Sequence, residues 1–479
     1  MLDIASVKKT SVPLVATANA VEREVPDHTE PRRRRGADPI VTAPAFDVIV
    51  VGGRPAGASL AARLASRGLS VLVADKADFP SHPEVPSCPI MYSSAVRLLD
   101  EIGFHEADYA AATTRIRKSL VAFEGYFQAT IPVRMAHGRD YLYGFDRGRF
   151  DSALWDHLGR FPSITRRSGL AVSHLLRDPS GCVRGIVGAP KGGPPERFEA
   201  RLAVVGADGR HSTIARRCGA RVVEEQATHT STVHFAEWEG LAPAAPDGEP
   251  VIHIVSTGRG RNVLFFPSCD GKVSVGTHAR ADLPSNGDAA KHYLGQLRSL
   301  PTAWRRLQGA RQCGPLRGVR RIANRYRDHG GPGWVLVGDA VTHKDPIDGQ
   351  GIHDALAGAR ALAELLVAVH EGRLRWDAML DRYQRAVHEI TYAMYQQTMK
   401  RLVRDLYSTP SPLAIRTLLR WALEDPEYQR RFMLFLARAI PPAEFRTPAL
   451  LAGVIGRGIA RDLAGLIRLN QANSTPPFL

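Results

Sequence analysis

Cysteine pairs, long apolar runs and nucleic-acid recognition motifs are all missing from this sequence of 479 residues. No uninterrupted apolar run approaches the roughly 18 residues of a membrane-spanning helix, so no transmembrane segment is expected. The cysteines are odd in number, scattered and never arranged as C-x-x-C, and they are Cys88, Cys182, Cys218, Cys269 and Cys313. This usage argues against a disulfide framework and against a zinc site. It favours a reducing compartment, and we expect a cytoplasmic protein without a bound metal.

Acidic residues are fewer than basic residues, 48 against 63, and the formal net charge is +15. Between Arg298 and Arg327 the chain holds nine arginines and no acidic residue. A basic balance of this size can indicate nucleic-acid binding, but no recognition motif or aromatic-interleaved basic strip accompanies it. We therefore expect no nucleic-acid partner. The 298–327 cluster is interpreted either as a basic face that attracts an anionic ligand or as a plain basic surface.

The segment from Phe46 to Asp75 has the pattern of a strand, a turn, a helix and a second strand. Residues 47–51 are too apolar to alternate, which indicates a strand buried on both faces. The chain turns at Gly52, and this turn aims the N-terminus of the following helix beyond the strand end. Unpaired N–H groups and the positive end of the helix dipole make such a point a pyrophosphate site. Asp75 follows 23 positions after Gly52 (75 − 52), where a carboxylate commonly binds the ribose of an adenosine.

This turn departs from the G-x-G-x-x-G pattern at one position. Arg54 stands where the middle glycine normally lets the backbone approach the diphosphate. Two interpretations remain open. Either the diphosphate lies slightly further out, or the Arg54 guanidinium itself pairs with it.

Two further motifs each follow an apolar strand directly. The first is Gly206-Ala-Asp-Gly-Arg-His-Ser212, in which Ser212 is suited to cap the next helix. The second is Gly338-Asp-Ala340, followed by Asp345-Pro-Ile-Asp-Gly-Gln-Gly351 and a long helix to about residue 371. A helix that starts near Gly351 presents unpaired N–H groups and a positive dipole end. We expect all three motifs to meet at the carboxyl ends of one parallel sheet.

In this order and spacing, the three motifs resemble those of the single-component FAD-dependent monooxygenases of the aromatic-hydroxylase type. Arginine in the first motif, Gly333-Trp-Val-Leu-Val-Gly-Asp-Ala340 and His343-Lys-Asp-Pro-Ile347 are most similar to a bacterial branch known as NAD(P)/FAD-dependent oxidoreductases. The resemblance covers roughly residues 45–372. It implies FAD as the cofactor, with NADH or NADPH and O2 as co-substrates.

The resemblance also implies roles for individual residues. Gly52 and Gly57 shape the turn at the diphosphate, Asp75 holds the adenosine ribose, and Arg147, in an R-x-x-hydrophobic-D motif, lies along the FAD. Asp208 belongs to a motif linked to both FAD and the pyridine nucleotide. Asp339 holds the ribityl or diphosphate region, with a helix or turn cap as its structural alternative. The cofactor-binding residues predicted in this way are Gly52, Gly53, Arg54, Ala56, Gly57, Asp75, Lys76, Arg147, Asp208, Gly338, Asp339, Pro346, Gly349, Gln350, Gly351 and Ile352.

The reaction that the resemblance implies is a monooxygenation. A transiently bound nicotinamide reduces the FAD, O2 adds at the flavin C4a, and the C4a-hydroperoxyflavin hydroxylates or epoxidises a small organic substrate. The substrate could be aromatic, polyketide or isoprenoid-like, and no side chain is required as nucleophile or base, so no catalytic residue is assigned. The helix after Gly349–Gly351, placed at the flavin's pyrimidine edge, would stabilise the charge of the reduced flavin.

Three other functions are weighed against this one. An FAD-dependent reductase resembling geranylgeranyl reductases uses the same motifs without oxygen and is the main alternative. A flavin halogenase is disfavoured because its W-x-W-x-I-P signature is missing. A non-enzymatic protein docked on a membrane through the amphipathic stretches 413–423 and 450–466 is disfavoured. Arg457, Arg461 and Asp462 interrupt the second stretch, and packing on the FAD domain, or a dimer contact, explains it better. A homodimer stays open.

The predicted fold class is α/β, with a Rossmann-like FAD-binding domain built on a parallel sheet. A mostly antiparallel substrate domain interleaves with it, and a C-terminal helical region follows. The antiparallel strands of 231–277 are expected to cover the flavin ring, with His234, His253 and Phe265 as candidate pocket residues or, alternatively, packed sheet residues. The predicted boundaries are a disordered basic, proline-rich tail at 1–44, an FAD-binding domain at 45–83, 140–216 and 330–372, a substrate domain at 84–139 and 217–329, and a helical region at 373–479.

Overall fold

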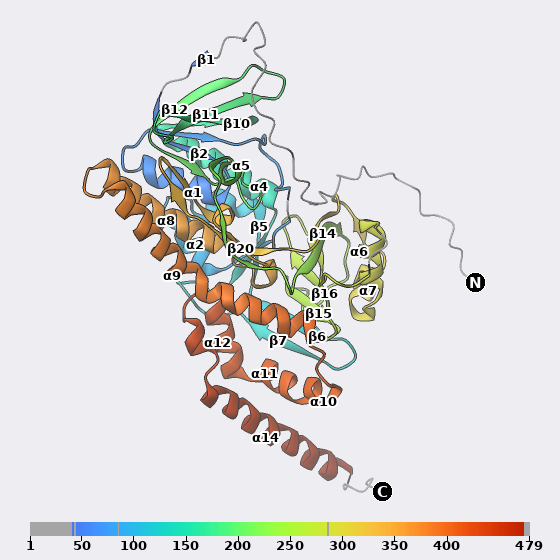
Figure 1. Cartoon of the computed structure of the whole chain (residues 1–479). Coiled ribbons are helices and arrows are strands. Elements are labelled where there is room, and N and C mark those ends of the chain that lie inside the picture. Colours follow the sequence, from blue (N-terminus) through green and yellow to red (C-terminus); the bar gives the residue numbers. More distant parts are fainter. Residues whose placement is uncertain (1–40, 43–44, 85, 285–286, 474–479) are drawn as a thin grey trace.

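The computed structural model in Figure 1 describes residues 41–42, 45–84, 86–284 and 287–473. Most of the expected tail therefore lies outside the described residues. Its exception is β1 (Val41–Thr42), which pairs in parallel with Glu196 and Arg197. For these two residues the expectation of disorder is wrong, because the sheet edge offers them backbone hydrogen-bonding partners.

A parallel sheet carries the nucleotide-binding unit that the sequence predicts. The apolar run forms β2 (Phe46–Val51), which lies between β3 (Val71–Ala74) and β12 (Glu196–Gly206). β9 (Ile164–Arg167) and β22 (Trp334–Leu336) complete the parallel order β9-β3-β2-β12-β22. Because all five strands run in one direction, the loops that follow them meet at one edge of the sheet.

Helices rich in alanine cover this sheet. α1 (Pro55–Ala65) begins with proline, whose fixed φ suits the first turn, and it packs against α8 (Gly351–His370). Leu98, Leu99 and Tyr109 lie in the same buried core as these helices. Residues 93–109 therefore pack with the parallel sheet, although the predicted boundaries place them in the substrate domain. The other helices of this layer are α2 (Ser93–Asp100), α3 (Glu106–Tyr109), α4 (Arg147–His157) and α5 (Thr213–Cys218). The hairpin of β10 (Leu170–Arg177) and β11 (Val183–Pro190) extends the sheet, because β11 pairs antiparallel with β12.

A second sheet has the order β18-β14-β17-β16-β15-β6-β7, with β19 also on β14. Every pair in it is antiparallel except β15 with β6, so the predicted α/β class with a mostly antiparallel second sheet is confirmed. α6 (Ala289–Arg298) and α7 (Pro301–Leu307) pack on one face of it. Its strands are β6 (Lys118–Phe123), β7 (Phe127–Pro132), β14 (Ser231–Glu239), β15 (Ile252–Ser256), β16 (Arg261–Pro267), β17 (Val273–Arg280), β18 (Arg311–Gln312) and β19 (Arg317–Val319).

Short strands connect the two sheets. One small sheet has the order β4-β8-β5 and another has the order β13-β20-β23, while β21 pairs with β22. Their bounds are β4 (Ile90–Met91), β5 (Thr113–Ile116), β8 (Leu142–Phe145), β13 (Val222–Gln226), β20 (Asn324–Arg327), β21 (Gly330–Gly331) and β23 (Thr342–His343).

The C-terminal region is helical and divided by prolines, as predicted. α9 (Trp376–Leu402) buries Met379 and Tyr383 in the core of the parallel sheet. α14 (Pro448–Asn473) lies along α11 at the far end of the molecule from β10–β12 (Figure 1). In the described ranges, no helix is both long and apolar enough to cross a bilayer. The remaining elements are α10 (Pro412–Ala414), α11 (Arg420–Glu424), α12 (Pro426–Leu436), α13 (Pro442–Phe445) and π-helical turns at Val403–Tyr407 (η5) and Ile415–Leu419 (η6).

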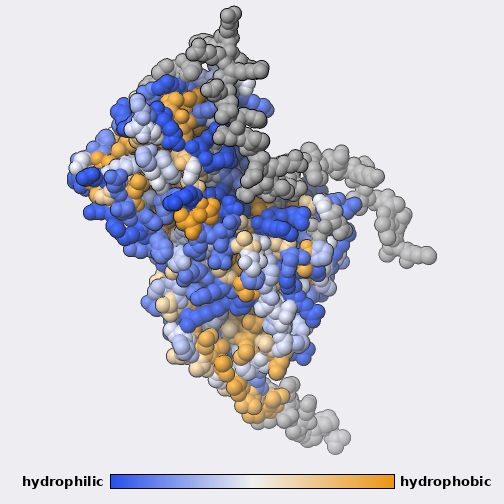
Figure 2. Space-filling view, viewed as in Figure 1, coloured by the Kyte–Doolittle hydropathy of each residue, from blue (hydrophilic) through white to orange (hydrophobic). Residues whose placement is uncertain are grey.

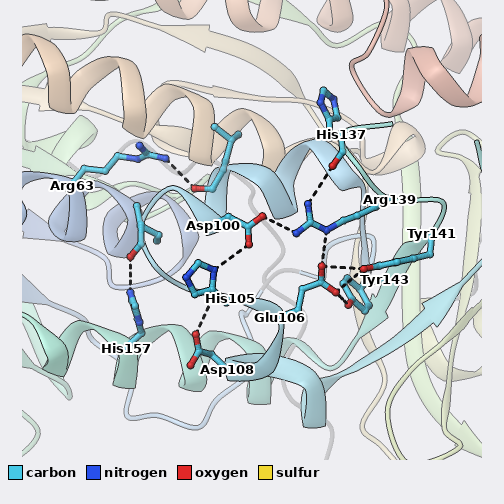
Figure 3. Close-up of polar contacts among 12 residues, drawn as sticks. Arg63, Asp100, His105, Glu106, Asp108, His137, Arg139, Tyr141, Tyr143 and His157 are labelled. Atoms are coloured by element: carbon cyan, nitrogen blue, oxygen red, sulfur yellow. Dashed lines mark hydrogen bonds and ion pairs between the residues drawn. The ribbon is translucent and has the colours of Figure 1, made fainter. Parts of the chain in front are cut away.

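A half-buried carboxylate, Glu106 at the start of α3, ties the helical layer to β8 (Figure 3). The hydroxyl groups of Tyr141 and Tyr143 donate to it, and Arg139 Nε and Arg115 Nη2 donate at 2.6 and 3.1 Å. Burial opposes ionisation of Glu106. The hydrogen bonds from Tyr143, Arg139 and Tyr141 outweigh that cost and hold its pKa at about 2.

Glu106→Gln is expected to lower the free energy of unfolding at pH 7 by about 1–3 kcal/mol, because it removes a charge from a network of charge-assisted hydrogen bonds. Glu106 has a depressed pKa, so its contribution is complete above its ordinary value of 4.5 and is lost as pH falls through about 2. Urea unfolding of both proteins between pH 7 and pH 2 checks this. The gap should close toward the acid end, and a gap that stays constant would contradict the role of the charge. Glu364→Gln, at an exposed site on α8, is the matched control.

Candidate functional site

The loops at the carboxyl edge of the parallel sheet enclose a cavity of about 530 Å³. α9 closes one side of it with Tyr383, Val387 and Thr391. Gly53 and Gly57 are the two predicted residues that lie behind its surface. The predicted residues that line it are Gly52, Arg54, Ala56, Asp75, Lys76, Arg147, Asp208, Gly338, Asp339, Pro346, Gly349, Gln350, Gly351 and Ile352.

The first motif turns where three backbone segments touch. Gly52 has φ +106°, and a Cβ there would lie 2.4 Å from the carbonyl oxygen of Ala207. A Cβ on Gly57 would lie 1.8 Å from the carbonyl oxygen of Gly52, and one on Gly53 would lie 2.3 Å from the ring of Trp155. These contacts leave no room for side chains, so the three glycines are required by packing.

Asp75 shapes this turn as well as lining the cavity. One carboxylate oxygen accepts the N–H of Gly53 at 2.7 Å, and the other accepts the N–H of Ala77 at 2.9 Å. The neighbouring Lys76 pairs with exposed Glu84 at 2.7 Å. Asp75 therefore already has two backbone partners within the protein.

Two cavity arginines share one fully buried carboxylate, that of Asp151. Arg54 Nη1 lies 2.5 Å from it and also donates to the carbonyl oxygen of Ser81. Arg147 Nη2 lies 2.9 Å from the same carboxylate, and Nη1 donates to Ser87 Oγ at 2.7 Å. Arg54 thus binds the loop after β3 to α4, a role that neither interpretation of the first motif included. Asp151 is the acid of the R-x-x-hydrophobic-D motif, and sequence reasoning gave it no role.

Asp208 caps the next helix. Its carboxylate accepts the backbone N–H groups of Thr213 at 2.6 Å and Ile214 at 3.1 Å, and the hydroxyl of Ser212 at 2.5 Å. Burial raises the pKa of Asp208, and these hydrogen bonds oppose the rise. Asp208 therefore has a structural role in the protein and also lines the cavity.

Asp339 and Arg210 are charged residues of the cavity wall whose side chains lack hydrogen-bonding partners within the described residues. Among the described residues, none hydrogen-bonds to the Asp339 carboxylate, and Nε and Nη1 of Arg210 are buried without a partner. Burial raises the pKa of Asp339, with Arg210 as the largest opposing charge, and burial lowers the pKa of Arg210. Both side chains are half-buried, and charges that are partly removed from water are costly unless a ligand satisfies them. A ligand with both hydroxyl groups and anionic oxygens, such as the ribityl diphosphate of FAD, fits this pair.

Sequence reasoning missed Arg210 as a site residue. The available signal was its position directly after Gly209 in the second motif, at the end of a buried strand. Its backbone is held by β20, because the Arg327 guanidinium donates to the Arg210 carbonyl oxygen at 3.0 Å.

The loop before α8 is held from several sides. Asp345 caps it by accepting the N–H of Ile347 at 3.0 Å, and it also accepts from Ser231 and lies 3.0 Å from His278 Nε2. Gln350 donates to the carbonyl oxygen of Leu436 at 2.9 Å, and its own oxygen accepts from Arg438 Nε at 2.8 Å. The predicted cofactor residue Gln350 thus lines the cavity, while its side-chain amide binds Leu436 at the end of α12 and Arg438 just after it.

A cationic pair lies at the start of α8. Lys344 Nζ and Arg438 Nη2 both contact the carboxylate of Asp354, the latter at 2.6 Å. One carboxylate against two cations leaves a positive charge beside the helix N-terminus. Lys344 lines the cavity, and the sequence motif contained it without indicating a role.

The candidate pocket residues of the second sheet prove to be packed sheet residues. Phe265 is fully buried with the Arg306 guanidinium 4.3 Å above its ring, and His253 Nδ1 lies 3.1 Å from the same guanidinium. His234 lies 5.7 Å from His292 of α6. Among the described lining residues, none comes from 231–277. Ser231, at the start of β14, contacts the lining residue Asp345. The three candidate side chains point to α6 and α7 because that layer buries their face of the sheet.

Comparison with known proteins agrees with an FAD site in this cavity. Residues 45–398 match a family model described as an FAD binding domain. Ubiquinone hydroxylase UbiL of Rhodospirillum rubrum is 29% identical over 335 residues, 67% of this chain and 72% of that protein. A digeranylgeranylglycerophospholipid reductase of Methanospirillum hungatei is 28% identical over 326 residues, 65% of this chain and 73% of that protein.

Solved structures share the fold. The flavin-dependent brominase Bmp2 superposes with a TM-score of 0.70 at 18% identity, covering 87% of this chain and 100% of that one. The family match spans the parallel sheet, all three motifs and most of α9. The chain therefore belongs to the FAD-binding-domain family that contains the monooxygenases of the aromatic-hydroxylase type, and it is an FAD-dependent oxidoreductase.

Proposed function

We propose that this protein is a monooxygenase that uses NADH or NADPH and O2 to hydroxylate or epoxidise a small organic molecule. The observation that carries the FAD part of this proposal is that the Asp339 carboxylate and the Arg210 guanidinium line one cavity with the start of α8, and that the described residues leave Nε and Nη1 of Arg210 without a hydrogen-bonding partner. A relative named as a hydroxylase supports the reaction class. FAD, when bound, supplies the redox chemistry by accepting a hydride and activating O2.

The chain's own residues bind and orient the cofactor. The turn at Gly52 and the N-terminus of α1 would hold the diphosphate, and Asp75 would hold the adenosine ribose. Asp339 would accept from ribityl hydroxyl groups, and Arg210 would donate to anionic oxygens. The start of α8, with Lys344 close by, would stabilise negative charge that develops at the edge of the cofactor facing it.

The substrate class that we favour is isoprenoid-like. Two relatives are named after lipids, which are ubiquinone in one name and digeranylgeranylglycerophospholipid in the other. Aromatic and polyketide skeletons were the other options from sequence. The lipid names favour a substrate with a long apolar part.

A reductase is the second candidate, because one of these relatives is named as a reductase and shares about the same identity with this chain. The two reactions use the same cofactor cavity. They differ in what is added to the product, which is one oxygen atom in the first case and two hydrogen atoms in the second.

Asp339→Asn and Arg210→Gln are each expected to weaken FAD binding by about 1–3 kcal/mol, the cost of losing a charge-assisted hydrogen bond. That range corresponds to a Kd raised roughly 5- to 150-fold. Titration of the flavin-free protein with FAD, followed by flavin fluorescence, measures it. The controls are Asp377→Asn and Arg216→Gln, which change exposed residues of the same types. Wild-type affinity in both site variants would contradict the assignment.

The reaction class is tested by turnover with NADH or NADPH under isotope-labelled O2, using short-chain prenylated quinones as probes. We expect NAD(P)H consumption that depends on the probe and a product containing one labelled oxygen atom. Product mass measured in parallel without O2 separates the candidates. A product gaining two hydrogen atoms in the absence of O2 would replace the monooxygenase with the reductase.

A further inference from the structure

The outward face of α14 is a continuous apolar stripe. Its large residues recur at nearly every fourth position and are 40–59% exposed. They are Leu451, Ile455, Ile459, Leu463, Leu466 and Ile467. Figure 2 shows apolar surface gathered at this end of the molecule. Contiguous exposed apolar surface of this kind marks an interaction site on a folded protein.

The stripe results from a fixed rotation of the helix. Leu450 and Val454 are buried on the inner face. Gly458 lets α14 meet Trp421 closely, because a Cβ there would lie 2.2 Å from the indole. These contacts orient the opposite face toward solvent.

The charged residues of α14 between 451 and 467 pair with the neighbouring helices and lie beside the apolar stripe. Arg457 pairs with Asp425 at 2.7 Å, and Asp462 pairs with Arg420 at 2.6 Å. Arg461 donates to the carbonyl oxygen of Glu424 at 3.0 Å. The exposed stripe is therefore free of charge along its whole described length.

The neighbouring segment extends this surface and adds positive charge. Leu413 and Leu418, on α10 and the adjoining η6 turn, are 71% and 50% exposed, and η6 contacts α14. Arg416 lies between them in sequence, and Arg446 precedes α14. Within the described residues, neither arginine forms an ion pair with a carboxylate. The Arg416 guanidinium lies 5.6 Å from the centre of the Tyr126 ring, and Arg446 donates to the Tyr428 hydroxyl at 3.1 Å.

From these observations, we propose that the α14 stripe, with Leu413 and Leu418, docks on the surface of an anionic lipid bilayer. An amphipathic helix lies in the interface with its apolar face buried, and nearby cations pair with anionic headgroups. A second copy of the chain fits less well, because it carries the same formal net charge of +15 as the first. The same charge favours an anionic bilayer as the partner.

Docking at this surface would also bring the cofactor cavity close to lipid-like substrates in the bilayer. α14 packs on α11 and α12, and the chain just after α12 binds Gln350 at the cavity. A lipid-like substrate could then enter from the bilayer instead of from water. This last step rests on the proposed function, whereas docking itself does not.

The test is flotation of the purified, flavin-loaded protein with vesicles of phosphatidylcholine alone or mixed with phosphatidylglycerol. We expect the wild type to float with the anionic vesicles, and Ile455→Asp combined with Ile459→Asp to lower that partition about ten-fold or more. Met135→Asp changes a residue that is 62% exposed in a loop and should bind as the wild type does. Flavin content and circular dichroism confirm that each variant is folded.

Several results would overturn the proposal. One is an absence of flotation with either vesicle, and another is equal binding to both compositions, which would remove the anionic part. A third is a stable wild-type dimer that the double variant converts to monomers without any vesicle binding, which would assign the stripe to a second copy. None of these outcomes depends on turnover, so docking and the proposed function can fail separately.

Discussion

The close backbone contact at Gly52 determines where everything else in the site can lie. The Gly52 N–H donates to the carbonyl oxygen of Ala74 at 2.7 Å, and the Ala207 N–H donates to that of Val51 at 2.7 Å. These bonds hold the ends of β3, β2 and β12 together. Because no side chain fits at Gly52, the first helix can start directly beyond the strand. The second motif is then held against the first with no space between them.

A cavity at such an edge is surrounded by charges, and the protein neutralises some of them itself. Asp151 neutralises two arginines, Asp208 caps a helix, and Asp354 pairs with two cations. Asp339 and Arg210 differ, because burial opposes the charge of each and the described residues provide no hydrogen bond to the groups that face the cavity. Groups left open at such a cost mark the place where a ligand completes the structure.

Local sequence was enough to predict the backbone of this region. Each apolar run became a strand within about two residues of its predicted end, and β2 and α8 follow the pattern directly. The partners of long side chains could not be predicted in the same way. Arg54 binds Asp151, which lies 97 residues away, and Gln350 binds Leu436, which lies 86 residues away. Such pairs depend on how distant segments pack, which neither spacing nor periodicity encodes. For the same reason, the sequence left open which way His253 and Phe265 face.

The C-terminal helices link the cofactor region to the outer surface of the molecule. α9 adds Tyr383 and Val387 to the cavity wall, and Arg438, just after α12, binds Gln350 and Asp354. Arg438 makes both of those contacts from a backbone with φ of +55°, a conformation that residues other than glycine rarely adopt. A strained residue persists where surrounding contacts outweigh its cost. Arg438 therefore connects the chain just after α12, the helix on which α14 packs, directly to the start of α8.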